Sequence, residues 1–378
     1  MKIVQVVPSL EVRYGGPSKS VLGLSSALAA SGEDVSLLTT EPAGGWARSD
    51  GPLAISAFER GRPGSLCVSA GLRRALQNVQ ADIVHHHSIW LRTLHYSHVA
   101  ARRTGASLVV SPRGMMDPWA WHHHVRRKAF ARRFIHPGAF ESVDGWHATS
   151  AEEEGSLRAL GFNQPVCVAP NGVAEPTEAD LTQSATYWRN VLGPQADRPI
   201  ALFYSRLHRK KRLIELMDLW FEKGPDDWLL LIVGIPEDYT VRMLETYALR
   251  AGYTGRILVF NGIDIPPPYA IASLFLLPSH GENFGLSIAE AMASGVPVLV
   301  TDTTPWHGVN DAGAGWCVPW TDFGSALNAA VLEGSAGLRQ RGSVAKKWVL
   351  ERFSWDRSAR LLMDFYASLR SRTARSIR

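Results

Sequence analysis

Residues 274–302 have the sequence LFLLPSHGENFGLSIAEAMASGVPVLVTD. Two short apolar runs, 274–277 and 298–301, are separated by a turn that contains Gly281 and Gly285 and by an apolar helical segment. Short, uninterrupted apolar runs are typical of strands that are buried on both faces, and the order strand–helix–strand predicts that the two strands pair in parallel. This stretch therefore predicts an α/β fold.

The same alternation recurs along the chain and breaks once, in a polar stretch with three prolines between 174 and 199. We predict two doubly wound, Rossmann-like parallel-sheet domains at 1–174 and 199–352, a linker at 175–198, and a C-terminal helix with a basic tail at 353–378 that packs back on the first domain. Ligands of such sheets bind outside the carboxyl ends of the strands, so we expect the site in a cleft across which the two domains face each other.

The composition is that of a soluble globular protein: 378 residues, 46% hydrophobic, 20% charged and a net charge of +5. The three cysteines lie far apart, which argues against a disulfide framework and fits a reducing compartment. The first strand begins at the first residue and leaves no room for a signal peptide, and no apolar run is long enough to span a membrane. We expect a cytoplasmic protein.

Two carboxylates flank the glycine turn, with Glu282 before it and Glu290 in the second turn of the helix. A helix N-terminus at a strand end favours an anion such as diphosphate, and Gly285 lets the backbone approach it closely. A carboxylate that accepts from two sugar hydroxyls is a strong, charge-assisted recognition element. On spacing alone, a second interpretation stays open, in which Glu282 only complements the helix dipole and Glu290 is a solvated surface residue.

The block 274–302 resembles the E-x7-E signature of the retaining GT-B glycosyltransferases of family GT4. Similar family segments occur over almost the whole chain: VPSLEVRYGGPSKSV at 7–21, VAPNGV at 168–173, SRLHRKKRL at 205–213, TPWHGVNDAGAGWCV at 304–318 and FSWDRSARLL at 353–362. The resemblance implies a GT-B fold and a hexosyltransferase. The domain 1–174 would take the acceptor, and the domain 199–352 would bind a UDP- or GDP-linked sugar.

The resemblance also implies roles for individual residues. Glu282 would contact the hexose and Glu290 the ribose, while Arg206 and Lys211 would neutralise the diphosphate as negative charge grows on it. The backbone of residues 284–286 (Phe284, Gly285 and Leu286) would meet the sugar and the distal phosphate. The family usually has glycine after this lysine, but Arg212 follows here, so Lys210, Lys211 and Arg212 all stay candidates. We expect substitution of Glu282 or Lys211 to lower turnover and to leave the fold intact.

Histidines are grouped at His85-His86-His87 and at 122–124. Alternate side chains of a strand face opposite ways, so the first three cannot converge on one ion, and the second group has no ligand partner at helical spacing. By the resemblance, His87 would lie against the donor sugar, and the chemistry would need no metal. The absence of a second acid near the sugar in the family pattern suggests front-face substitution, in which a donor phosphate oxygen takes the proton of the acceptor.

Further contacts are expected at glycine loops and strand ends. Gly15 and Gly16 would bring the first loop close to the acceptor or to the donor phosphates, although a GGP triplet alone also fits an ordinary turn. Gly262 follows a strand at the point where we expect the base of the nucleotide. Arg113 follows another strand and is a candidate to bind a phosphate or a sugar of the acceptor.

The segment WHHHVRRKAFARRFIH at 121–136 is predicted to be a basic amphipathic helix with Trp121, Val125, Phe130 and Phe134 broadly on one side. Such a helix can lie on an anionic bilayer, peripheral to the inner face of the membrane, or it can pack on the core with a solvated basic face. In the first case a lipid-diphosphate-linked sugar or glycan is the natural acceptor, as in surface polysaccharide synthesis such as lipopolysaccharide or exopolysaccharide assembly.

Three other functions remain to be weighed. A nucleotide-sugar epimerase can share the fold, but it would need acid/base residues around the sugar. An NAD-dependent oxidoreductase is disfavoured because the first loop lacks G-x-G-x-x-G. A nucleic-acid-binding protein is compatible with the basic helix, but no recognition module is present, so we expect no nucleic-acid partner.

Overall fold

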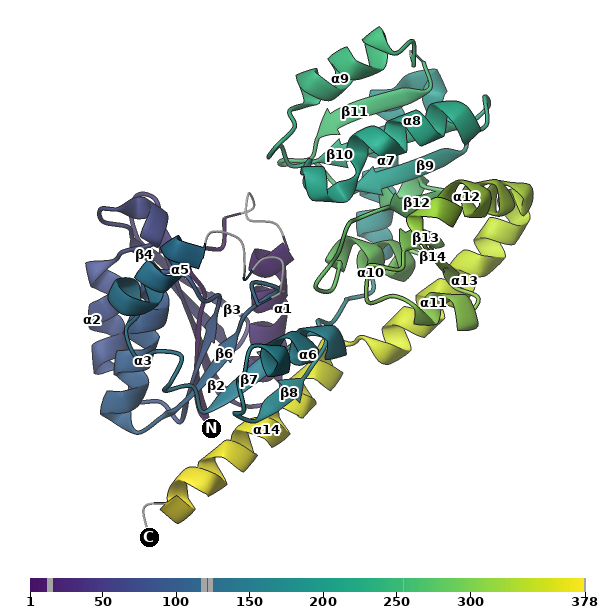
Figure 1. Ribbon diagram of the computed structural model, residues 1–378. Helices are drawn as coiled ribbons and strands as arrows, with labels where there is room; N and C mark the ends of the chain where they lie inside the picture. Colours follow the sequence, from purple (N-terminus) through teal and green to yellow (C-terminus); the bar gives the residue numbers. More distant parts are fainter. Residues whose placement is uncertain (12–15, 117–120, 122–124, 254, 377–378) are drawn as a thin grey trace. The chain divides into compact units, whose positions relative to one another are not determined.

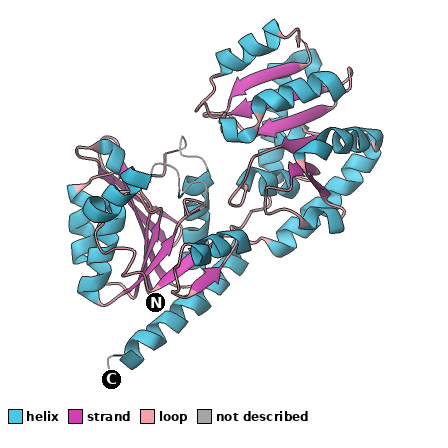
Figure 2. Cartoon of the chain, in the orientation of Figure 1, coloured by secondary structure: helices cyan, strands magenta, loops and turns pink. Residues whose placement is uncertain are grey.

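The computed structural model describes residues 1–11, 16–116, 121, 125–253 and 255–376. The chain divides into two compact units: unit 1 comprises Met1–Gly172 together with Trp355–Arg378, and unit 2 comprises Val173–Ser354 (Figure 1). In both units the strands lie between helices (Figure 2). No helix among the described residues is long and apolar enough to cross a membrane.

Unit 1 is built on an eight-stranded sheet with the strand order β3-β4-β2-β1-β5-β6-β7-β8. Every neighbouring pair is parallel except β3 and β4 at the edge, which are antiparallel. The strands are β1 (Lys2–Val6), β2 (Asp34–Glu41), β3 (Trp46–Asp50), β4 (Leu53–Glu59), β5 (Ile83–His87), β6 (Ser107–Ser111), β7 (Gly145–Ala148) and β8 (Val166–Val168). Apolar side chains on both faces explain the uninterrupted hydrophobic runs.

Helices cover both faces of this sheet, and the core forms two clusters. One cluster joins β-strand residues such as Val84 and Val110 to helices that include α2 (Ala70–Asn78) and α3 (Arg92–Thr104). The other joins residues such as Ile3 and Val109 to α1 (Gly16–Ala30) and α14 (Trp355–Ser376). Among the described residues, unit 1 also has α5 (Val125–Phe130), which continues as a π-helix at Ala131–Ile135, α6 (Ala151–Ala159) and a 3₁₀ turn at Gly64–Leu66.

Helix α14, the last of the chain, packs on unit 1 because glycines leave room for it. A Cβ atom at Gly145 would lie 2.5 Å from Cζ of Phe365, and one at Gly172 would lie 2.3 Å from the backbone nitrogen of Trp355. Tyr366 is fully buried in the same cluster as α1 and the sheet. The chain therefore returns to its first unit after completing the second.

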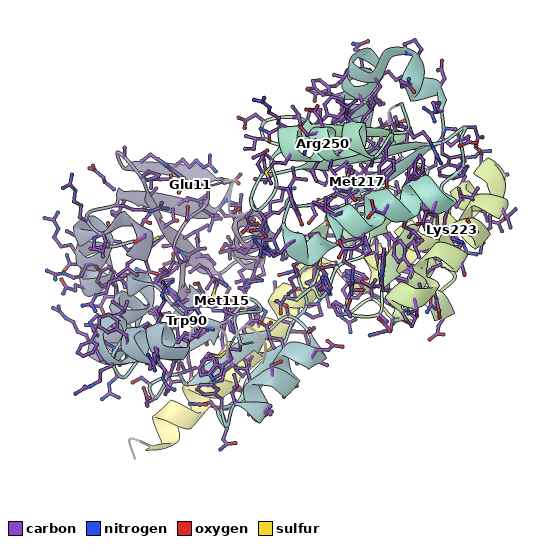
Figure 3. All side chains as sticks on the ribbon, turned by 45° about the horizontal axis from the view of Figure 1, so that its top comes forward. Glu11, Trp90, Met115, Met217, Lys223 and Arg250 are labelled. Carbon is purple, nitrogen blue, oxygen red and sulfur yellow. The ribbon has the colours of Figure 1, made fainter. Side chains whose placement is uncertain are left out.

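Unit 2 has a six-stranded, fully parallel sheet in the order β11-β10-β9-β12-β13-β14. Its strands are β9 (Ile200–Tyr204), β10 (Leu229–Gly234), β11 (Ile257–Asn261), β12 (Leu274–Leu277), β13 (Val298–Thr301) and β14 (Gly315–Val318). Its helices include α8 (Leu213–Lys223), α9 (Val241–Arg250), α10 (Leu286–Ala293), α11 (Gly308–Asp311), α12 (Phe323–Leu332) and α13 (Gly334–Arg352). A single core cluster includes Met217 of α8, which is labelled in Figure 3. The sheet order reverses direction between β9 and β12, so loops at this point belong to two neighbouring strands that are far apart in sequence.

The segment 175–198, treated above as a linker, contains helix α7 (Glu178–Leu192) and belongs to unit 2. A capping box at Thr177 and Asp180 begins the helix, and Trp188 and Leu192 are buried in the core of unit 2. The Trp188 indole donates to the carbonyl of Pro266 at 2.8 Å. Polar residues and prolines at both ends of the segment conceal this helix in the sequence.

Candidate active site

Two loops of unit 2 are joined where β9 and β12 end side by side. A 3₁₀ turn at Arg209–Lys211 follows β9, and residues 279–285 follow β12. The backbone amide of His280 donates to the carbonyl of Lys210 at 2.7 Å, and the hydroxyl of Ser279 donates to the same carbonyl at 3.2 Å. These bonds hold the basic turn and the acidic loop together at the carboxyl edge of the sheet.

A buried ion pair connects the two loops: Nζ of Lys211 donates to Oε1 of Glu282, and Lys211 is only 6% exposed. Burial by itself would raise the pKa of Glu282, but the charge and hydrogen bond of Lys211 bring it below its usual value. Burial lowers the pKa of Lys211, and Glu282 offsets this only in part. The pair therefore favours the charged form of both groups, and each is the main counter-charge of the other.

Lys211 and Arg212, two of the three basic candidates at 210–212, have different contacts. Lys211 contacts Glu282, whereas the guanidinium of Arg212 lies 5.2 Å from the ring centroid of Trp320. Arg212 has a φ of 52°, in the left-handed region that glycine occupies most easily. The glycine that the family usually has at this position is therefore explained by backbone conformation, and Lys211 is the lysine that faces the acid.

Helix α10 begins at Leu286, as the sequence predicts, with Gly285 as its N-cap at a φ of 80°. A Cβ atom at Gly285 would lie 2.8 Å from Cδ1 of Ile288, so glycine is required for both conformation and space. The side chain of Phe284 is buried against Trp306, and the Trp306 indole donates to the Phe284 carbonyl. Phe284 therefore anchors the loop, which leaves its side chain no part in binding a ligand.

Glu290 is held by a residue that the sequence analysis missed. The hydroxyl of Tyr269, in the 3₁₀ turn Pro268–Ile271, donates to Oε2 of Glu290 at 2.9 Å. Burial, followed by the charge of Glu290, raises the pKa of Tyr269 well above its usual value, so the phenol stays a donor. A lone tyrosine within a proline-rich stretch gives no spacing signal, and only the fold brings it to the helix.

Arg206 lies in a different setting from Lys211. Its guanidinium pairs with the carboxylate of Glu237 at 2.8 Å, and both side chains are about 40% exposed, at 42% and 40%. An exposed pair of this kind contributes at most about 1 kcal/mol. Arg206 can therefore exchange Glu237 for a ligand anion at little cost. Gly262 follows β11 and donates to the carbonyl of Gly234 at 2.9 Å, with too little space there for a side chain to be added without shifts.

Unit 1 carries its own group of polar residues at the carboxyl edge of its sheet. Nε2 of His87 bonds to Oε1 of Gln5 at 2.6 Å, and the guanidinium of Arg113 donates to Nδ1 of His87 at 3.0 Å and to Oδ1 of Asn171 at 2.7 Å. His87 is 1% exposed. It is thus buried with both ring nitrogens bonded, while the partly buried Arg113 extends from it. Gly16 is the first residue of α1, and Gly15 lies outside the described residues.

The hydrogen-bond partners of His85 and His86 confirm that alternate side chains of β5 face opposite ways. His86 bonds to Thr93 of α3 at 2.9 Å, whereas His85 bonds to the hydroxyl of Tyr366 of α14 at 2.7 Å. A grouping that the sequence analysis did not foresee adds His147 of β7 to His85 and His87: one ring nitrogen from each lies within 4.8 Å of the others.

The segment 121–136 differs from a single amphipathic stripe. Residues 122–124 lie outside the described residues, and Trp121 packs inward, with its ring centroid 5.5 Å from that of Trp90. Trp90 and Met115, both in unit 1, are labelled in Figure 3. Phe130 and Phe134 are 56% and 60% exposed, and their ring centroids are 4.8 Å apart. Among the side chains that the structure describes in this segment, the exposed apolar surface is therefore a pair of phenylalanines.

Comparison with known proteins places this geometry in a class. A family described as "Glycosyl transferase 4-like domain" matches residues 15–172, and one described as "Glycosyl transferases group 1" matches residues 184–333. The crystal structure of Anabaena Alr3699/HepE in complex with UDP and glucose superposes with a TM-score of 0.75 at 18% identity, over 97% of this chain and 100% of the other. Two doubly wound units in this arrangement of strands and helices define the GT-B fold.

The chain belongs to the group 1 glycosyltransferases of family GT4 and is a glycosyltransferase. It is 28% identical over 346 residues to the D-inositol 3-phosphate glycosyltransferase of Xylanimonas cellulosilytica, covering 82% of this chain and 78% of that protein. It is 34% identical over 182 residues to a GDP-mannose-dependent alpha-mannosyltransferase of Mycolicibacterium smegmatis, covering 48% of this chain and 46% of that protein.

Proposed function

We propose that this glycosyltransferase moves a hexose from a UDP- or GDP-linked sugar to a glycan or lipid-diphosphate-linked acceptor, with retention of configuration, in surface polysaccharide synthesis. The observation that carries the proposal is the buried pair of Lys211 and Glu282 beside the start of α10. A charged pair in this position presents one cation and one carboxylate at the same strand edge, which are the two groups that a sugar diphosphate requires.

In this mechanism the donor binds to both members of the pair and replaces part of their contact with each other. Glu282 accepts hydrogen bonds from hexose hydroxyls, and Lys211 with Arg206 contacts the diphosphate. When the glycosidic bond breaks, negative charge grows on the leaving phosphate, and fixed cations stabilise that charge more than they stabilise the bound donor. A phosphate oxygen of the donor takes the proton of the acceptor hydroxyl, so the acceptor attacks on the face that the nucleotide leaves. The two cations do the work that a metal ion would do, and we propose that no metal is needed.

The nucleoside lies against the second carboxylate. Glu290 accepts from the ribose hydroxyls, and Tyr269 fixes the direction of its carboxylate through the bond at 2.9 Å. We expect the base at the backbone near Gly262, where the 3.3 Å approach of a Cβ atom to the Gly234 backbone favours glycine. UDP or GDP fits this account equally, since backbone groups supply the contacts to the base.

In this proposal unit 1 supplies the acceptor site, with Arg113 after the carboxyl end of β6 and Gly16 at the start of α1. One relative is named as a D-inositol 3-phosphate glycosyltransferase, which is compatible with a phosphorylated acceptor at this unit. His87, which is buried with both ring nitrogens bonded, would act on a ligand only through Arg113 in this arrangement.

The pair Phe130 and Phe134 supports peripheral binding to an anionic membrane surface. Arg126, Arg127 and Arg133 are exposed beside it, and a basic segment with exposed aromatic rings gains from both burial of apolar area and attraction to anionic lipids. Such binding would bring a lipid-linked acceptor to unit 1.

Transfer is tested by supplying purified protein with UDP-glucose, UDP-galactose or GDP-mannose and a panel of lipid-diphosphate-linked sugars. Nucleotide release that requires acceptor, together with a product of unchanged anomeric configuration by NMR, supports the proposal. An epimerised nucleotide sugar without nucleotide release would point instead to the epimerase. Activity that survives EDTA supports the metal-independent mechanism, and activity that returns only with a divalent ion contradicts it.

Membrane binding is tested by cosedimentation with vesicles that contain phosphatidylglycerol. The variant F130S/F134S should bind at least tenfold more weakly than the wild type, and salt should weaken the wild type. Leu332 on α12 is 86% exposed, so L332S is the matched control and should bind like the wild type. Equal binding by F130S/F134S and L332S would refute a membrane role for this segment.

A further inference from the structure

Arg113 has the contacts of a cation that is held ready for a ligand. It follows β6 with a φ of 55°, a left-handed conformation that costs a non-glycine residue roughly 1 kcal/mol. Two guanidinium nitrogens donate to His87 and Asn171, at 3.0 Å and 2.7 Å. The third, Nε, is buried and has no hydrogen-bond partner among the described residues. A strained backbone and an unused side-chain donor at one residue are features expected of a binding residue.

Both partners of Arg113 are neutral. Asn171 contributes an amide oxygen, and the Nε2–H of His87 donates to Oε1 of Gln5 at 2.6 Å, so the lone pair of Nδ1 is left to accept from Arg113. Burial, and then the nearby charges of His85 and Arg113, lower the pKa of His87 well below its usual value. Gln5 therefore fixes the tautomer of His87, and His87 in turn fixes the guanidinium without neutralising it.

The neighbouring carboxylate is committed elsewhere. Glu153 of α6 is buried, and its two oxygens accept from the backbone amides of Gly114, at 2.5 Å, and Thr149, at 2.8 Å. Among the described residues, no ion pair is formed by Arg113, although the charge of Glu153 acts on it at longer range. A partly buried guanidinium whose direct contacts are neutral has lost hydration that only an anion can fully replace.

A metal ion is the other ligand that this cluster suggests, because nitrogens of His85, His87 and His147 lie within 4.8 Å of one another. Either ring nitrogen of His87 would place the ion close to Arg113, whose guanidinium lies 3.0 Å from Nδ1 of that ring. A divalent cation beside a buried arginine without a contacting carboxylate would be strongly repelled. The charge of the cluster therefore favours an anion.

We propose that Arg113 is the receptor for an anionic group of the acceptor, a phosphate or a carboxylate, so that the enzyme selects acceptors that carry such a group. This inference rests on the proposed function for the identity of the ligand as an acceptor. Gln5, His87 and Asn171 are positioning residues: they hold the cation without neutralising it, and its Nε–H donor stays unused among the described residues.

The direct test follows the Nε–H signal of Arg113 by NMR with ¹⁵N-labelled arginine, assigned by its loss in R113K. Inositol phosphate and glucuronate are the two probes, and uncharged inositol and methyl glucoside are their controls. A saturable shift with either anion and none with the controls supports the inference, and the two probes separate phosphate from carboxylate. A signal that no anion moves refutes it.

Turnover with matched acceptors gives a second measure. R113K should lower kcat/KM at least tenfold for an acceptor with an anionic group and less than twofold for the same acceptor without it. N171D replaces the amide that contacts Arg113 with a carboxylate of nearly the same shape. This change should keep Arg113 in place but neutralise it, and so lower use of the anionic acceptor by a similar factor. If Arg113 only supports the fold, N171D will be harmless and R113K will affect both acceptors alike, which contradicts the inference.

The two proposals fail separately. UDP or GDP binding depends on unit 2. If neither nucleotide binds, the proposed donor is refuted, and the NMR titration of Arg113 still decides whether unit 1 binds an anion. Normal nucleotide binding with an unresponsive Arg113 would leave the proposed function in place and refute the anionic acceptor.

Discussion

Removing the charge of Lys211 should destabilise unit 2 and not only slow the reaction. Lys211 is 6% exposed, and its partner Glu282 is 11% exposed at the side chain. Removal of one member of a buried pair leaves the other charge without its counter-charge, which costs about 3–5 kcal/mol. We therefore expect K211M to lower the free energy of unfolding by this amount, whereas the sequence alone suggested that the fold would be indifferent.

The magnitude can be converted to a melting temperature. For a domain of this size, 1 kcal/mol corresponds to about 2–4 °C, so K211M should lower the melting temperature of unit 2 by roughly 6–20 °C. E282Q removes the opposite charge and should cost a comparable amount. The double variant K211M/E282Q removes both charges together and should be more stable than the sum of the single changes predicts, with a coupling of about 2–3 kcal/mol.

Urea unfolding of the four proteins, followed by tryptophan fluorescence, completes the cycle. R206Q is the control, since its exposed pair with Glu237 should change stability by less than about 1 kcal/mol. A loss below 1 kcal/mol in K211M, or additive effects in the double variant, would refute the view that the pair is a buried, mutually dependent unit.

Three further results are expected. Y269F should weaken UDP or GDP binding about three- to tenfold by calorimetry, through the lost bond to Glu290, and should matter less for a 2′-deoxynucleotide; equal losses for both would contradict a role at the ribose. Q5E should raise the pKa of His87 toward its usual value, so use of an anionic acceptor should fall at a higher pH than in the wild type, because a protonated imidazole cannot accept from Arg113; identical pH profiles for the two proteins would count against this. Burial lowers the pKa of His86 and His147 to about 3, so below pH 6.5, where the unfolded histidines gain protons, unit 1 should lose stability by about 1.4 kcal/mol per pH unit for each such histidine; hydrogen exchange at pH 5 that protects unit 1 as well as at pH 7 would exclude this effect.

Much of the fold could be predicted because it is encoded locally. Each strand of unit 2 is a short, mostly apolar run, and all of them except β11, which leads into the 3₁₀ turn Pro268–Ile271, are followed by an α-helix. The start of α10 at Leu286 follows directly from Gly285. Helix α7 could not be placed in the same way, because its buried face depends on only three residues and the rest of the segment is polar.

Site residues that lie within one sequence motif could be predicted. Those that come together from separate strands and loops could not. Glu282 and Glu290 lie in one block of sequence, and Lys211 reaches the first of them because β9 and β12 are neighbours. Tyr269, Gln5 and Asn171 come to their partners from other strands and loops, and no spacing along the chain marks them. The histidine group fails in the same way, since His147 is brought to β5 across an intervening strand.

The central claim is that unit 2 binds a nucleoside diphosphate through Lys211, Arg206 and Glu290, and its most direct test is the melting temperature of the protein with UDP, GDP, ADP and CMP, with and without magnesium. At a concentration of 100 times Kd, binding stabilises the folded state by about 2.7 kcal/mol, or roughly 5–10 °C for this unit. The account predicts such a shift with UDP or GDP, independent of magnesium and absent in E290A. No shift with any nucleotide, or an equal shift in E290A, would contradict it.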